Sequence, residues 1–380
     1  NSTNKIMFND ASQFIQGSSA TVLSLGATDE IDLTATLIDI NGNADVSGTV
    51  TATGTSVFAS LDISGDIDVD GTANLDAVDV DVSLTVDGTV KLNGNFPTGT
   101  DNVALGNDAL SDGSLSGAGN IAIGDSAAKA LTSGSNAIAI GRDAMSAAVF
   151  TGSDAVGVGR STLAALTSGS NNVAVGGLAG TALTTGGNNV ALGFEALKTE
   201  DTSGSATAIG YQALRVQNSG GSNSHNSAVG AGAGTSITTG NQNTIFGSAA
   251  ADALTDADFN VAMGYNALSS DTLGSKSTAL GTDTLATQNF TTATDSFNTA
   301  VGYQAGLSIS TGIRNTLIGS GAGDALTDAD LNVAVGRDAL TSDTLGSQSV
   351  AIGTNALANQ NFTTATNSLN TAVGHSAGSS

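Results

Sequence analysis

The sequence contains no cysteine and no tryptophan, and it has a single proline among 380 residues. Without cysteine there can be no disulfide, no thiolate metal site and no thiol nucleophile. No run of about 18 apolar residues is present, so no segment is expected to cross a membrane as a helix. No positively charged segment followed by an apolar run marks a secretion signal. Membrane insertion is therefore not expected.

Positive charge is also scarce. Ten lysines and arginines oppose 34 acidic residues, which gives a formal net charge of −24. Phosphate groups would repel such a chain, and this argues against nucleic-acid partners and against anionic membrane surfaces. The apolar fraction of 39% is too high for a solvated, disordered coil. Only three of the acids are glutamate, and aspartate favours turns and caps over helices. The composition therefore predicts short strands joined by tight turns.

Glycine is abundant, with 50 copies, and its placement is periodic. A motif of the form Asn/Ser-apolar-Ala-apolar-Gly recurs sixteen times from Asn102 onward, usually at a spacing of 17 residues. A longer period of 72 residues separates Gly230, Gly302 and Gly374. The motif glycines are predicted to turn the chain with positive φ. They are Gly106, Gly124, Gly141, Gly159, Gly176, Gly193, Gly210, Gly230, Gly247, Gly264, Gly281, Gly302, Gly319, Gly336, Gly353 and Gly374.

Seventeen residues are too few for a two-helix repeat but suit one rung of a β-solenoid. Alternation in the motif strand puts Val333 and Val335 on one face and Ala334 on the other. Ala339 and Leu340 then begin the return side. Because both strand faces are apolar and a thin roll has one interior, we expect a homo-oligomer in which the small alanine row lets chains approach closely. The alternative is a monomer with alanine turned to solvent.

The rungs Asn332 to Gly336 and Ser349 to Gly353 resemble the head repeats of trimeric autotransporter adhesins. The resemblance covers residues 100–380 approximately. It implies a left-handed parallel β-roll that associates as a trimer.

Residues 35–96 follow a different rule, a strict alternation with short glycine spacings, as in Ile38 to Gly54. Period two indicates strands, here with one apolar and one Asp/Thr face. Such runs resemble the shafts of bacteriophage tail-fibre and receptor-binding proteins. Residues 1–34 are interpreted as a small β segment, and Pro97 marks the start of the roll, residues 97–380. The predicted fold class is thus all-β: an elongated fibrous homotrimer with a β shaft and a parallel β-roll of about sixteen rungs.

Few residues suggest chemistry. The two histidines, His225 and His375, have no nucleophile or acid at a recognisable spacing. Asp256 with Asp258, repeated 72 residues later, could be a carboxylate pair or calcium ligands, but solvated corner residues are the simpler interpretation. We expect no catalytic residue, no metal and no cofactor.

Three long rungs carry three or four extra residues, at Ala213–Asn226, Leu285–Asn298 and Leu357–Asn370. Insertions in solenoids emerge as loops. Phe290, Phe362 and His225 in these rungs are candidate surface-contact residues, although the two phenylalanines could instead plug a widened rung.

The function expected from these features is that of a structural and adhesive fibre. A phage tail fibre that attaches the virion to its host, without catalysis, is favoured. Its partners would be copies of itself, other virion tail proteins and a host cell-surface glycan or protein. The alternative is a bacterial trimeric surface adhesin or extracellular filament subunit at the cell surface. A carbohydrate-cleaving tailspike is the third and least favoured option, since glycan sites commonly use aromatic rings and aromatics make up 4% of this chain.

Overall fold

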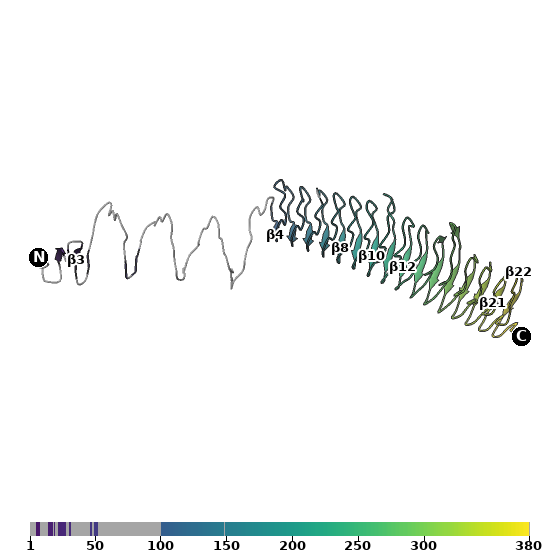
Figure 1. Ribbon diagram of the computed structural model, residues 1–380. Coiled ribbons are helices and arrows are strands. Elements are labelled where there is room, and N and C mark those ends of the chain that lie inside the picture. Colours follow the sequence, from purple (N-terminus) through teal and green to yellow (C-terminus); the bar gives the residue numbers. More distant parts are fainter. Residues whose placement is uncertain are drawn as a thin grey trace. The chain divides into compact units, whose positions relative to one another are not determined.

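The structure is a computed structural model, shown in Figure 1. It divides into two units, Asn1–Thr85 and Val86–Ser380. The predicted shaft, residues 35–96, lies almost wholly outside the described residues, as does Pro97. The structure describes residues 5–7, 14–17, 19, 22–27, 30–31, 46–47, 49–51, 100–147 and 149–379.

The described part of the first unit holds a small antiparallel sheet, in agreement with the β segment predicted there. Its strands are β1 (Lys5–Met7), β2 (Phe14–Gly17) and β3 (Leu23–Gly26), paired in the order β1-β2-β3. Ile6 and Leu23 are largely exposed, at 62% and 69%. The sheet as described thus buries little apolar surface.

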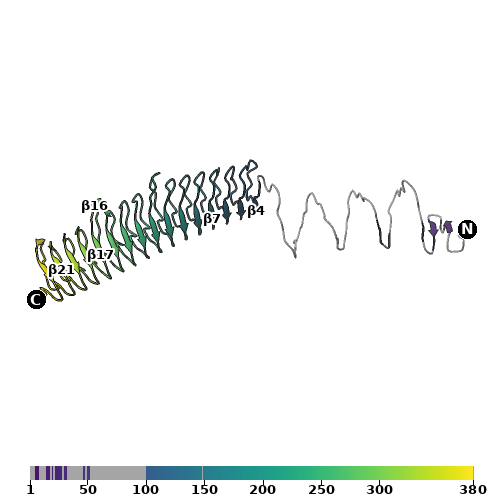
Figure 2. The ribbon, with the colours of Figure 1, turned by 180° about the vertical axis from the view of Figure 1, so that it is seen from behind.

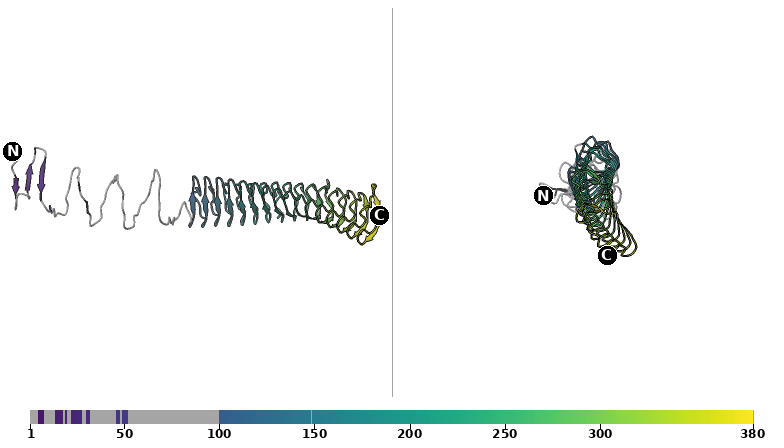
Figure 3. Two further views of the ribbon diagram at one scale, coloured as in Figure 1. Left: turned by 90° about the horizontal axis from the view of Figure 1, so that it is seen from below. Right: turned by 90° about the vertical axis from the view of Figure 1, so that its right-hand side faces the viewer.

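The second unit is a parallel β-solenoid, which confirms the predicted roll. Sixteen three-residue strands form one parallel sheet that runs along one side of the stack of rungs, with the loops on the other side (Figures 1 and 2). Viewed along the stack, the later rungs are displaced progressively from the first ones (Figure 3). The strands are β4 (Val103–Leu105), β5 (Ile121–Ile123), β6 (Ile138–Ile140), β7 (Val156–Val158), β8 (Val173–Val175), β9 (Val190–Leu192), β10 (Thr207–Ile209), β11 (Ser227–Val229), β12 (Thr244–Phe246), β13 (Val261–Met263), β15 (Thr278–Leu280), β17 (Thr299–Val301), β18 (Thr316–Ile318), β19 (Val333–Val335), β21 (Val350–Ile352) and β23 (Thr371–Val373).

The motif glycines turn each strand into its corner, as predicted. Their φ angles lie between 123° and 150°, a region that L side chains rarely adopt. Stacking adds a second constraint: a Cβ on Gly281 would lie 2.5 Å from the carbonyl oxygen of Gly302 in the next rung. Rotation and close approach therefore both require glycine at this corner.

The interior of the roll is narrow and is filled from both sides. In Val333–Val335 the middle residue, Ala334, is fully buried, and it shares the core with buried Leu340 from the return side. Where the middle residue is larger, the facing position is smaller. The side chain of Leu317, for example, lies where a Cβ on Gly323 would be, 2.8 Å away. Large and small residues thus alternate across the core and keep its width nearly constant.

This arrangement corrects the expectation about the alanine row. Alanine was predicted to face a neighbouring chain, whereas Ala122, Ala208 and Ala334 are 0% exposed in the structure. The larger residues at either side of each alanine, such as Val333 and Val335, point outward and are only partly buried. The reason is the space taken by return-side leucines: opposite them only a methyl group fits in most rungs.

A ladder of buried asparagines holds consecutive rungs together. In each member the side-chain oxygen accepts the backbone N–H of the equivalent residue one rung later, and the side-chain amide donates to a carbonyl 14 or 15 residues ahead. These hydrogen bonds satisfy backbone groups that the narrow core leaves without another partner. The members, all at most 3% exposed, are Asn102, Asn120, Asn172, Asn189, Asn226, Asn243, Asn260, Asn298, Asn315 and Asn332.

The long rungs widen the solenoid locally, and their extra residues are exposed, as expected for insertions. Short parallel pairs accompany two of them: β14 (Gly274–Ser275) with β16 (Thr294–Asp295), and β20 (Gly346–Ser347) with β22 (Thr366–Asn367). The β16 region projects from the stack in Figure 2.

Candidate interaction surface

The outward face of the sixteen-stranded sheet is an uninterrupted apolar strip. Each strand ends in an apolar residue that points away from the core, and the parallel register places these residues in one row. None of them is buried, and their exposure reaches 56% at Phe246 and 67% at Val373. We call this row, together with the first residue of each strand, the outer ribbon. The row consists of Leu105, Ile123, Ile140, Val158, Val175, Leu192, Ile209, Val229, Phe246, Met263, Leu280, Val301, Ile318, Val335, Ile352 and Val373.

The other row of the outer ribbon changes character along the solenoid. From β4 to β9 the first strand residue is always Val or Ile, whereas from β10 onward Thr or Ser is more frequent. Neither row contains a charged residue in any of the sixteen strands, in a chain with 44 charged residues. A face that carries the exposed apolar side chains and excludes charge has the composition of a surface that becomes covered.

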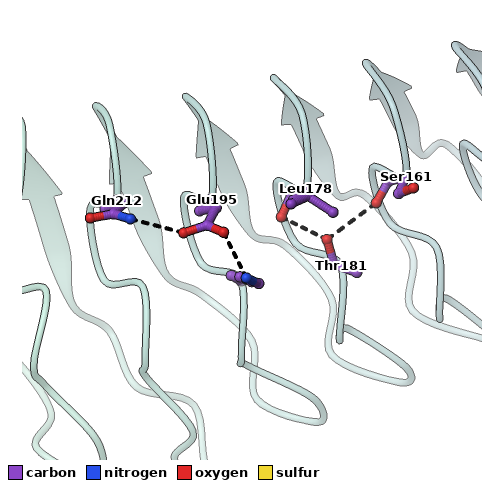
Figure 4. Close-up of polar contacts among 6 residues, drawn as sticks. Ser161, Leu178, Thr181, Glu195 and Gln212 are labelled. Atoms are coloured by element: carbon purple, nitrogen blue, oxygen red, sulfur yellow. Dashed lines mark hydrogen bonds and ion pairs between the residues drawn. The ribbon is translucent and has the colours of Figure 1, made fainter.

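Polar side chains line the corner just beyond the strand. Glu195 follows the corner of the β9 rung and accepts hydrogen bonds from Lys198 Nζ at 2.6 Å and from Gln212 Nε2, one rung later, at 2.9 Å (Figure 4). The contact with Lys198 is the main cause, and that with Gln212 the second, of a pKa for the Glu195 carboxyl below its ordinary value. In the neighbouring rung, Thr181 donates to the carbonyl oxygen of Leu178 at 2.7 Å. This corner is therefore a polar ladder beside the outer ribbon.

Three acidic side chains lie inside the roll and were not identified from the sequence. Glu200, Asp271 and Asp343 are 0% exposed, and each lies one rung before a long rung. Asp271 accepts hydrogen bonds from the backbone N–H groups of Gly274 and Phe290, both at 3.0 Å, and from Gln288 Nε2 at 2.5 Å. They occupy a position that is Leu or Ile in other rungs, such as Leu254. Their recurrence about 72 residues apart was the available signal.

These carboxylates support the start of each widened rung. Gln288, which bonds Asp271, also donates to Ser277 Oγ at 2.9 Å and accepts from Asn298 Nδ2 at 2.8 Å. The network therefore joins the buried acid to the asparagine ladder. Every acceptor and donor in it is used within the protein, so its role is structural.

The candidate contact residues in the long rungs have different environments. Phe290 is 5% exposed and its ring packs against Gly274, where a Cβ would come within 2.7 Å of it. This is the plug alternative that the sequence left open. Phe362 packs against Gly346 in the same manner but is partly exposed. His225 is exposed, with φ of 51°.

The paired aspartates cap the loops of the preceding rung. Asp256 accepts a hydrogen bond from Thr239 Oγ1 at 2.6 Å, and Asp258 accepts the backbone N–H of Asn241 at 2.8 Å. Among the described residues, no group of three or more His, Cys, Asp or Glu side chains is arranged to hold a metal ion. The same part of the chain contains no helix long and apolar enough to cross a membrane.

Comparison with known proteins gives no relative: no family model matches the sequence, and neither a curated protein nor a solved structure matches it.

Proposed function

We propose that this protein is a structural and adhesive fibre that assembles as a homotrimer through the outer ribbon. The observation that carries the proposal is the uncovered face of an all-parallel sheet. Parallel sheets occur almost only with both faces covered, and here one face packs on the core while the other exposes sixteen consecutive apolar residues. A second and a third copy of the same chain would cover it with an identical, uncharged ribbon.

The size of the ribbon supports association. Fifteen rung intervals of about 4.8 Å give a length of roughly 72 Å, and a width of about 10 Å gives an area of roughly 700 Å². That exceeds the few hundred Å² of a typical apolar patch on a monomer and is close to the roughly 800 Å² per partner of a standard stable interface. Apolar rows that run parallel to the stack would also hold the chains in register along their length.

The favoured setting for such a fibre is a phage tail, where it would bind other virion tail proteins and present its loops to a host surface without catalysis. Binding through three chains would raise the apparent affinity by avidity. A bacterial surface adhesin or filament subunit is the second candidate, since the resemblance of the Asn332 to Gly336 rung to adhesin heads favours it.

Assembly is tested by the mass in solution of the wild type and of Val301→Asp/Ile318→Asp, which places two carboxylates on adjacent rungs of the ribbon. We expect a trimer for the wild type and a monomer for the double variant. Thr292→Asp, on an exposed insertion loop, is the matched control and should remain trimeric. A monomeric wild type would refute the assembly. Immunogold electron microscopy with an antibody against the rungs then distinguishes a virion tail from a cell surface.

A further inference from the structure

All three tyrosines of the chain occupy the same position in their rungs. Tyr211, Tyr265 and Tyr303 each follow a motif glycine directly, at the corner beside the outer ribbon. Their exposed fractions are 55%, 55% and 54%. None of the three hydroxyl groups has a hydrogen-bond partner among the described residues. An aromatic side chain left half in water at one repeated position, and nowhere used for packing, indicates a role outside the core.

Rings at this corner stack along the solenoid. Phe194 precedes Tyr211 by one rung at the same position, and their ring centroids are 5.9 Å apart with an interplanar angle of 12°. The backbone ladder fixes this alignment, because the N–H of Gln212 donates to the carbonyl oxygen of Phe194 at 2.9 Å. One ring per rung is therefore a stacked arrangement that the corner accommodates.

Tyr265 and Tyr303 reproduce this arrangement with the middle ring missing. The N–H of Asp283 donates to the oxygen of Tyr265 at 2.9 Å, and that of Gln304 to the oxygen of Thr282 at 3.0 Å, so Tyr265, Thr282 and Tyr303 lie on consecutive rungs. Two rung intervals separate the tyrosines by about 9.6 Å. Stacked rings have centroids about 4.5–7 Å apart, so this interval accepts one ring between the two tyrosines, above the short Thr282.

The groups beside this interval form hydrogen bonds and carry no positive charge. The residues that follow the three corner positions are Asn266, Asp283 and Gln304, all partly buried. Asn266 Nδ2 donates to Asp283 Oδ1 at 3.3 Å, which leaves the second carboxylate oxygen of Asp283 and the amide of Gln304 without another side-chain partner in the described residues. The ligand that fits has a ring with apolar faces and hydroxyl groups at its rim. Asp283 and the net charge of −24 disfavour an anionic one.

We propose that the interval between Tyr265 and Tyr303, with Thr282 as its floor, binds one neutral hexose unit of a glycan. The axial C–H groups of the pyranose ring stack on the two tyrosines, and its hydroxyl groups bond to Asn266, Asp283 and Gln304. This inference rests on the proposed adhesive function and assigns it a site. On a trimer the site would occur three times around the fibre, so weak single contacts would add.

The experiment is a binding titration of the full chain on arrays of immobilised neutral hexose oligosaccharides: glucans, mannans and galactans. We expect binding to at least one class, weakened at least tenfold by Tyr265→Ser/Tyr303→Ser. Phe259→Ser removes an aromatic ring of similar exposure, 48%, at a different place in the rung and is the matched control that retains binding. Melting temperature and mass in solution are measured for each variant, and both should stay at the wild-type values.

Three results would overturn the site: no binding of any array member by the wild type, unchanged binding by the double tyrosine variant, or loss of the trimer in that variant. The last would show that the tyrosines contact a neighbouring chain. Each is separable from failure of the proposed function, because a wild-type trimer that lacks the sugar site remains a fibre, whereas a wild-type monomer does not.

Discussion

The side-chain oxygen of Asn315 accepts the backbone N–H of Asn332, one rung later, at 3.0 Å. The same side chain donates to the carbonyl oxygen of Ala329 at 2.7 Å. One buried amide therefore satisfies a backbone donor and a backbone acceptor of the next rung. Repeated along the stack, this contact does inside the roll what the β ladder does at its surface.

Removing that amide should destabilise the solenoid. Asn315→Ala leaves the N–H of Asn332 and the carbonyl of Ala329 buried without partners, and we expect a loss of about 2–4 kcal/mol. Asn223→Ala, on an exposed loop, should change the stability by less than about 0.5 kcal/mol. Chemical denaturation of both variants measures the difference, and equal midpoints would contradict the role of the ladder.

The corner glycines should not tolerate a methyl group. Gly281 has φ of 134°, and a Cβ there would lie 2.5 Å from the oxygen of Gly302. We expect Gly281→Ala to cost about 3 kcal/mol or more, from backbone strain and a lost rung contact. Gly113, where a Cβ meets no atom within 4 Å, is the control. If Gly113→Ala lowers the melting temperature as much as Gly281→Ala, the corner geometry is not the cause.

The two equivalent phenylalanines should differ in their contribution to stability. Phe290→Ser removes a buried plug and should cost about 3–5 kcal/mol, as for other buried aromatic truncations. Phe362→Ser, at a partly exposed site, should cost clearly less. Thermal unfolding of the two single variants tests this order. A larger effect at Phe362 would show that burial in the rung does not determine the contribution of the ring.

Acidification should weaken the corner ladder at Glu195. Hydrogen bonds from Lys198 and Gln212 lower the pKa of this carboxyl from its ordinary value of 4.5. A lowered folded-state pKa stabilises the fold fully at pH values above 4.5, and this contribution is lost as the pH falls through the folded-state pKa. The melting temperatures of the wild type and Glu195→Gln should therefore differ at neutral pH and converge in acid. A difference that is constant with pH would contradict the assignment.

Much of the architecture was predictable because it depends on local rules. The spacing of Gly264, Gly281 and Gly302 sets the rung length, and the absence of glutamate-rich, alanine-rich helical runs excludes helices. The insertions were predictable for the same reason, since three extra residues in a fixed period must leave the stack. The row of apolar residues that makes the outer ribbon was also visible, but its partner row was assigned to the surface instead.

The buried polar groups were not predictable in this way. Asn315 and Asp271 are residue types that usually lie at turns and in solvent, and no local pattern distinguishes them from exposed aspartates such as Asp256. Their burial depends on hydrogen-bond partners one rung away, 17 to 19 residues along the chain. The repeated tyrosine position was visible in the sequence. The stack of Phe194 on Tyr211, which gives that position its meaning, was not.

The sequence by itself determined that this is a parallel solenoid of sixteen rungs with glycine at every strand end, because a period of 17 with that punctuation admits few other folds. Alternation separated Val333 and Val335 from Ala334 without saying which face lies inside. Only the tertiary structure decided that. Leucines from the return side, such as Leu340, occupy most of the interior and leave room for the methyl group of Ala334 alone, so the larger side chains face outward and form the ribbon.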